Sequence, residues 1–148
     1  MATRIKNASR LTAADYRSLA QFRHALRQFL AFSEEAAAKA GLTPVQHQAL
    51  LAIKGMPEAG LAKAGAGVSV GDLARWLVVR HHSCVGLIER LEALRLIVKH
   101  TDPADRRRVV LTLTGRAERK LAALSAAHRD ELRRRAGALE LLLAAIRR

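Results

Sequence analysis

The sequence contains very little cysteine, few aromatic residues and no long apolar run. One cysteine among 148 residues excludes an internal disulfide framework and fits a reducing compartment. No apolar stretch approaches the length of a membrane span. The basic opening, MATRIKNASRLT, lacks the apolar region that would follow it in a secretory signal. We therefore expect a soluble, cytoplasmic protein without a membrane partner.

Acidic residues are also scarce relative to basic ones. The chain has 26 Lys and Arg against 13 Asp and Glu, which gives a formal net charge of +13. An excess of this size indicates a polyanionic partner, and nucleic acid is the most common one. The alternative is a basic surface that serves only solubility. Alanine and leucine are abundant, which favours helix, and the length suits one domain with a core.

Two helices are predicted in the first third of the chain. Thr12, followed three residues later by an aspartate, resembles an N-cap, and apolar residues then recur at helical spacing to about Lys39. Gly41 is suited to end this helix. Thr43, with proline next and glutamine three residues later, predicts the start of a second helix that ends at Gly55.

Two short helices follow residues 55–68, which are rich in glycine and proline and predict a flexible connection. Ser69 and Asp72 are expected to cap a third helix that runs to about Leu77 and buries Leu73 and Trp76. A turn at residues 78–79 leads to a fourth helix over residues 80–94. The apolar face of this fourth helix comprises Cys84, Leu87, Ile88, Leu91 and Leu94.

A β-ribbon with a basic tip comes next. Residues 96–100 and 109–113 are rich in β-branched and apolar residues, which favour strands. Residues 102–105, DPAD, favour a turn, and Arg106, Arg107 and Arg108 follow it. A fifth helix is predicted from Thr114, and a sixth over residues 138–146.

Short helices followed by a two-stranded ribbon make up the plan of a winged helix-turn-helix. The predicted fold class is therefore mainly α with a small β-wing. We expect a single domain over residues 1–148, with a winged helix-turn-helix lobe at 42–114. The helices at 11–40 and 115–148 carry apolar stripes beyond the needs of that lobe, and a second copy of the chain is the simplest cover for them.

The sequence resembles the MarR family of winged helix-turn-helix transcriptional regulators over roughly residues 11–136. Residues 105–114, DRRRVVLTLT, resemble the family's wing signature of Asp, any residue and Arg before a strand that ends in Leu-Thr. Residues 42–55 resemble its second helix, and residues 86–97 resemble the end of its recognition helix. Arg95 stands where the family usually has a glycine.

The resemblance implies a homodimer formed through the terminal helices and a DNA-binding function. Two recognition helices would enter successive major grooves of a pseudo-palindromic operator, and the wings would enter the flanking minor grooves. Many members are repressors that small anionic or phenolic ligands release, so the resemblance also implies a repressor with a small-molecule effector.

The wing residues have distinct predicted roles in DNA binding. Arg107 is expected to enter the minor groove, and Asp105 to orient it through a charge-assisted hydrogen bond. Arg106 is the alternative for the groove, and Arg108 is expected to contact phosphate. A solvated basic hairpin is the alternative interpretation of the whole run.

The fourth helix supplies the other predicted contacts. Arg80 and His81, at its start, suit a nearby phosphate. We expect His82, Ser83 and Val85 to contact bases: Ser and His reach groove acceptors, and Val suits a thymine methyl. Gly86 and Arg90 complete the outward face. Ordinary solvent exposure of a polar helix is the alternative for each of these residues.

The remaining candidate residues give weaker indications. His24 and His47 are predicted to contact a ligand or to pack, and together with His128 they carry no Cys or carboxylate at metal-binding spacing, so neither a metal nor another cofactor is expected. Cys84 falls on the buried face, which favours a core role over redox sensing. No catalytic motif is recognisable, so no enzyme is expected. Architectural nucleic-acid binding and protein-protein interaction remain the alternative functions.

Overall fold

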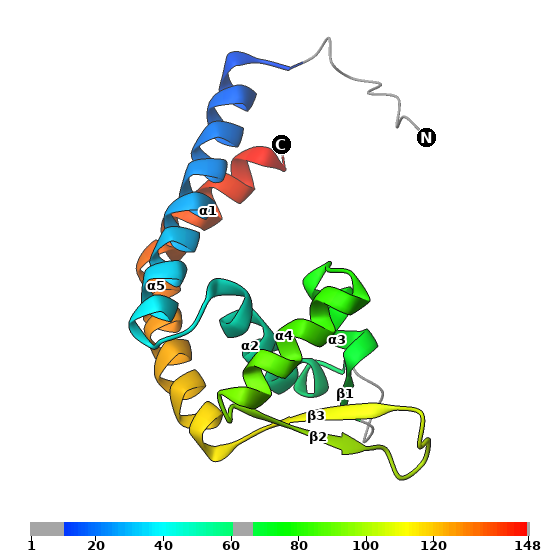
Figure 1. Ribbon diagram of the computed structural model, residues 1–148. Coiled ribbons are helices and arrows are strands. Elements are labelled where there is room, and N and C mark those ends of the chain that lie inside the picture. Colours follow the sequence, from blue (N-terminus) through cyan, green and yellow to red (C-terminus); the bar gives the residue numbers. More distant parts are fainter. Residues whose placement is uncertain (1–10, 61–66, 148) are drawn as a thin grey trace. The chain divides into compact units, whose positions relative to one another are not determined.

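The computed structural model describes residues 11–60 and 67–147 and confirms the predicted class, mainly α with a small wing (Figure 1). Its helices are α1 (Ala13–Lys39), α2 (Pro44–Glu58), α3 (Val70–Leu77), α4 (His81–Ala93) and α5 (Gly115–Ile146). Its strands are β1 (Val68–Ser69), β2 (Ile97–Thr101) and β3 (Val109–Leu113). The order of elements along the described chain is that of a winged helix with a long helix on either side.

The chain forms two compact units. The first comprises Met1–Ser33 and Ala127–Arg148, and the second comprises Glu34–Ala126. The second unit thus contains the predicted lobe at 42–114 together with the end of α1 and the beginning of α5. Those two helix segments belong with the lobe because Ala37, Ala117 and Leu121 are buried in its hydrophobic core.

The wing is a three-stranded antiparallel sheet in the order β1-β3-β2. Ile97 pairs with Leu113 and Thr101 pairs with Val109, so β2 and β3 form the predicted hairpin. The prediction of a two-stranded ribbon was incomplete, because β1 adds a third strand through Val68 opposite Leu111. A strand of two residues is too short to produce an alternating sequence pattern.

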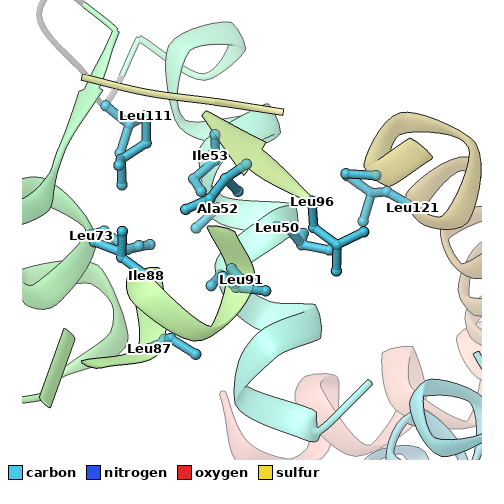
Figure 2. Close-up of a cluster of buried hydrophobic side chains, with 14 of the residues drawn as sticks. Leu50, Ala52, Ile53, Leu73, Leu87, Ile88, Leu91, Leu96, Leu111 and Leu121 are labelled. Atoms are coloured by element: carbon cyan, nitrogen blue, oxygen red, sulfur yellow. The ribbon is translucent and has the colours of Figure 1, made fainter. Parts of the chain in front are cut away.

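The core of the second unit receives side chains from α2, α3, α4, β3 and α5 (Figure 2). Leu50, Leu73, Ile88, Leu91 and Leu96 are all at most 2% exposed. The predicted apolar face of α4 is confirmed at Cys84, Leu87, Ile88 and Leu91. This interior is what fixes the exposed face of α4.

Two residues predicted to be buried are exposed. Trp76 is 49% exposed because Leu73 and Ala74 form the buried stripe of α3, and Trp76 lies off that stripe. Leu94, the C-cap of α4, is 41% exposed, and the chain leaves the helical conformation at the next residue, Arg95, whose φ is 56°. Leu96 then occupies the core position.

Helices α1, α3 and α4 end in the same turn. At each end a left-handed residue, Gly41, Val78 or Arg95, donates its N–H to the carbonyl three residues earlier. The following N–H donates to the carbonyl five residues before it, which completes a Schellman motif. The expected stop at Gly41 is confirmed, with φ at 75°. Arg95 has φ at 56°, so it adopts the backbone that a glycine would favour at this position.

Two predicted helix boundaries were wrong. Helix α2 continues past Gly55 to Glu58, because Met56 is buried in the core and keeps the last turn in place. Helix α5 continues through Gly137 to Ile146, so the predicted sixth helix is part of the fifth. A glycine costs a helix about 1 kcal/mol, which the surrounding Ala, Leu and Arg residues tolerate. Of the predicted flexible connection at 55–68, residues 61–66 lie outside the described part of the chain.

Candidate nucleic-acid interface

Helix α4 presents the predicted outward face to solvent. Arg80 is its N-cap, without a side-chain hydrogen bond to the helix. His82, Ser83 and Val85 are exposed, whereas Gly86 is half-buried. His81 and Arg90 are also exposed and complete this outward face. The polar and small side chains of α4 therefore point away from the core, as an element that reads a groove requires.

Cys84 lies on the opposite, buried side of α4. Its Sγ is 3.7 Å from the backbone carbonyl oxygen of Val70, at the start of α3. Burial raises the pKa of the Cys84 thiol, which disfavours the reactive thiolate. The thiol thus packs α4 against α3, in agreement with the predicted core position.

The tip of the wing is built by two aspartates that bind the turn backbone. Asp102 accepts a hydrogen bond from the Ala104 amide at 2.9 Å, and Asp105 accepts one from the Arg107 amide at 3.0 Å. The amide of Asp102 donates to the Arg108 carbonyl at 2.9 Å and closes the loop. The predicted turn is confirmed, because short Asp side chains favour such local bonds.

Arg107 extends from this turn into solvent. Its side chain is 96% exposed, and its Nε lies 3.7 Å from Asp105 Oδ1. The predicted charge-assisted hydrogen bond between the two side chains is therefore not formed. The same carboxylate oxygen instead receives the backbone amide of Arg107, which leaves the guanidinium in a longer ion pair. Arg106 is exposed as well.

Arg108 has entirely different surroundings. Its side chain is 22% exposed, and its guanidinium lies 3.1 Å from Asp72 Oδ2 and 3.1 Å from Asp102 Oδ2. It also donates to the carbonyl of Gly67 at 2.9 Å. Sequence analysis predicted Asp72 only as a helix cap, because nothing in the sequence pairs positions 36 and 41 residues apart.

Both carboxylates that face Arg108 are held in the charged form. Burial raises the pKa of Asp72, but hydrogen bonds from Ser69 and Arg108 outweigh it and leave that pKa below its usual value. The Ala104 amide, followed by Arg108, lowers the pKa of Asp102. Ser69 and Asp72 also form the predicted capping box of α3, and Thr43 forms the corresponding one in α2.

A concave site lies between the beginnings of α3 and α4 and the wing. Its volume is about 470 Å³, and polar side chains make up much of its wall. The lining residues are Ser69, Val70, Gly71, Asp72, Arg75, His81, Asp105, Arg107, Arg108 and Val109. The structure thus brings His81 of α4 and Arg107 of the wing to one site, although 26 positions in the sequence separate them.

The candidate ligand residues lie in different units. His24, in the first unit, is exposed and lines a cavity of about 390 Å³ together with Gln21, Ala25, Gln28, Ala138, Leu141 and Leu142. His47, in the second unit, is only 4% exposed. His128 packs edge-on against Phe29 and Phe32. Among the described residues, no three His, Cys, Asp or Glu side chains are grouped as a metal site would require.

An apolar groove between α2 and α3 was missed by sequence analysis. It has a volume of about 480 Å³ and includes the exposed side chains of Leu51, Trp76 and Val78. The assumption that Trp76 is buried hid this feature. Within residues 11–60 and 67–147, no helix is both long and apolar enough to cross a membrane.

Part of the chain matches a known protein family. Residues 40–108 match the model of the MarR family. Among solved structures, AbsC of Streptomyces coelicolor, a MarR family transcriptional regulator, is 18% identical, with 84% of this chain and 79% of AbsC covered and a TM-score of 0.66. No curated protein sequence matches the chain.

Two further solved structures share the fold. A MepR–DNA complex from Staphylococcus aureus is 18% identical, with 78% of each chain covered and a TM-score of 0.62. CouR of Rhodococcus jostii RHA1, bound to p-coumaroyl-CoA, is 22% identical, with 72% of this chain and 69% of CouR covered and a TM-score of 0.60. The match of residues 40–108 to the MarR family model agrees with the observed winged-helix fold.

Proposed function

We propose that this protein is a sequence-specific regulator of transcription that binds double-stranded DNA. The observation that carries the proposal is the concave site where His81 of α4 and Arg107 of the wing meet. A helix with an exposed polar face and a neighbouring basic hairpin are the two elements with which a winged helix reads adjacent grooves. The net charge of +13 supplies attraction to phosphate.

The comparisons support this proposal. MepR, which shares the fold, has been solved in complex with DNA, and AbsC is a transcriptional regulator. MarR-family proteins are regulators rather than enzymes, and we propose no catalytic activity for this chain. A regulator of this kind acts in the cytoplasm, where its DNA is found.

We assign specific DNA contacts to the exposed residues of α4 and the wing. His82, Ser83 and Val85 read bases in the major groove, while Arg106 or Arg107 enters the minor groove. Arg80, His81 and Arg90 approach phosphates, and Gly86 allows close approach of the helix. Asp105 supports Arg107 by fixing its backbone rather than its guanidinium.

The proposed active form is a homodimer built from the helices at 11–40 and 115–148. Many apolar side chains of the first unit are exposed, among them Leu30 at 54% and Leu141 at 74%. A dimer would cover them and would place two α4 helices on a pseudo-palindromic operator.

The proposal can be tested in two steps. Tightly bound duplexes are first enriched from a random pool, and their affinity for the protein is then measured by fluorescence anisotropy across a salt series. We expect a selected duplex to bind about 10³-fold more tightly than a scrambled one. Equal affinity for both, lost together as salt rises, would instead indicate architectural binding. Failure to bind any duplex would contradict the proposal and favour a protein partner.

Repression and release by a small molecule remain predictions. CouR is a relative by fold that has been solved with a small molecule, which makes an effector worth testing here. An effector must bind one conformation better than the other, because equal affinity shifts no equilibrium. His24 and His47 are the residues at which we propose to look for effector contacts first, by substitution to Ala and titration of DNA release.

A further inference from the structure

Three adjacent arginines of the wing differ sharply in their surroundings. Arg106 and Arg107 are exposed, whereas the side chain of Arg108 is only 22% exposed. We propose that Arg108 is a positioning residue, which anchors the wing to the start of α3 and makes no contact with DNA. The proposal rests on the proposed DNA-binding function. It assigns DNA contact to Arg106 and Arg107 and a structural role to Arg108.

The contacts of Arg108 join three separate segments. Asp102 belongs to the wing itself, Asp72 to the first turn of α3, and Gly67 to the segment just before β1. The planar guanidinium donates to all three from two nitrogens, at 2.9 to 3.1 Å. Such a forked geometry is specific to arginine and fixes direction as well as distance.

The charge of Arg108 is already matched. Two carboxylates, those of Asp72 and Asp102, lie 3.1 Å from its guanidinium. Arg75 pairs with the other oxygen of Asp72 at 2.6 Å, so four alternating charges form one cluster. A DNA phosphate that approached Arg108 would face both carboxylates, and their repulsion offsets its attraction. Arg106 has no such acidic partner among the described ion pairs.

Gly67 shows how closely the wing is held at this point. Its φ of 66° is in the left-handed region, and an added Cβ would lie 2.5 Å from Cγ1 of Val110 on β3. Only glycine therefore allows the carbonyl that accepts from Arg108 to sit this close to the strand. The anchor thus depends on the backbone of Gly67 as well as on the two carboxylates.

Anchoring of this kind fixes the position of the wing before DNA is bound. Asp72 and His81 line the same concave site as Arg107, so fixing Arg108 to Asp72 also fixes the wing relative to the start of α4. An element that is ordered in advance loses less conformational freedom on binding, which improves affinity without a new contact. Arg108 would therefore affect DNA binding through geometry alone.

Arg108→Gln and Arg106→Gln test the proposal as a matched pair, because each removes one positive charge from the same loop. The affinity of each variant for the selected duplex is measured across a salt series. For Arg106→Gln we expect a shallower dependence of log K on log salt. The magnitude of the slope should decrease by about 0.9 for each cation withdrawn from the DNA. For Arg108→Gln we expect a nearly unchanged slope and about tenfold weaker binding at every salt concentration.

Hydrogen exchange of the free protein provides a readout that needs no DNA. The amides of Asp102 and Arg108 donate within the wing turn, and we expect them to exchange faster in Arg108→Gln than in the wild type or Arg106→Gln. Arg108→Lys should restore little, because an ammonium cannot form the fork. Asp102→Asn is the second variant, for the case in which Arg108→Gln folds poorly. It keeps the Oδ1 acceptor for the Ala104 amide but loses the charge, so we expect the same pattern of exchange and affinity as for Arg108→Gln.

The possible outcomes separate the two proposals. If the magnitude of the salt slope decreases by about 0.9 in Arg108→Gln while hydrogen exchange is unchanged, Arg108 is a phosphate contact and the inference is overturned. Unchanged exchange with unchanged affinity would also overturn it. If the wild type binds no duplex, the proposed function fails, while the exchange experiment still decides whether Arg108 anchors the wing.

Discussion

The two compact units of this chain treat their apolar side chains in opposite ways. All the buried hydrophobic residues of the described chain lie in the second unit, between Ala37 and Leu124. In the described part of the first unit only Glu131 is buried, where Arg134 and Arg135 pair with it. Those two pairings lower the pKa of the Glu131 carboxyl.

The contrast teaches where each unit obtains its stability. The second unit has three or more elements around one core and can bury that core by itself. The first has two helix segments, joined by polar contacts such as His128 to Ser33 and Arg135 to Gln28. Two helices alone leave apolar surface in water, so this unit requires a further partner, which we propose to be a second copy.

The largest expected effect concerns the core of the second unit. Leu91→Ala removes a fully buried side chain and should lower the free energy of unfolding by about 2–5 kcal/mol. Leu51→Ala, at a position 47% exposed, is the matched control and should cost far less. Urea unfolding followed by Trp76 fluorescence measures both. Equal losses would break the distinction between buried and exposed leucines in this unit.

The next effect concerns the first unit. Leu141→Glu places a charge on its apolar surface and should raise the dimer dissociation constant about 30-fold or more. Sedimentation velocity over a dilution series measures this constant. Leu51→Glu places the same charge on an exposed leucine of the second unit and should leave it unchanged. A larger effect of Leu51→Glu would move the dimer interface to the second unit.

A smaller, pH-dependent effect is expected at the wing anchor. The pKa values of Asp72 and Asp102 are lowered in the folded protein, so their stabilisation is complete above an unfolded pKa of about 3.9. It is lost as the pH falls through the lower, folded values. The stability difference between wild type and Arg108→Gln should therefore be full at pH 7 and shrink below about pH 4. A difference that is constant with pH would contradict the ion-pair origin of the anchor.

The smallest effects concern the helix ends of the second unit. Val78 and Arg95 adopt φ of 56°, which costs a side-chain-bearing residue about 1–2 kcal/mol. Val78→Gly and Arg95→Gly should each raise stability by about 0.5–1 kcal/mol after the added flexibility of the unfolded chain is counted. Thermal unfolding measures the change. Gly41→Ala, at the equivalent turn of α1, should have the opposite sign, and stabilisation there would contradict this account.

Features that depend on neighbours in the sequence could be predicted from it. The capping boxes at Thr43 and Ser69 join residues three apart, and the turn at Asp102 joins residues two apart. The buried face of α4 follows from helical periodicity, and so does its exposed opposite face. The outward direction of His82 and Ser83 was therefore predictable.

Features that depend on distant neighbours were missed. Trp76 has the large apolar side chain typical of a core residue, yet the packing of α3 leaves it in a groove with Leu51. Strand β1 exists because Val68 pairs with Leu111, which no local pattern indicates. Met56 keeps α2 helical past Gly55 for the same reason, since tertiary burial overrides local propensity.

By itself, the sequence determined the order of helices, the wing and the basic composition of its tip. It did so because caps, turns and amphipathic periodicity act over a few residues. Only the tertiary structure decided that Arg108 turns inward while Arg106 and Arg107 stay in solvent. Identical side chains in one loop differ here because two carboxylates and a carbonyl, two of them 36 and 41 positions away, converge on one of them.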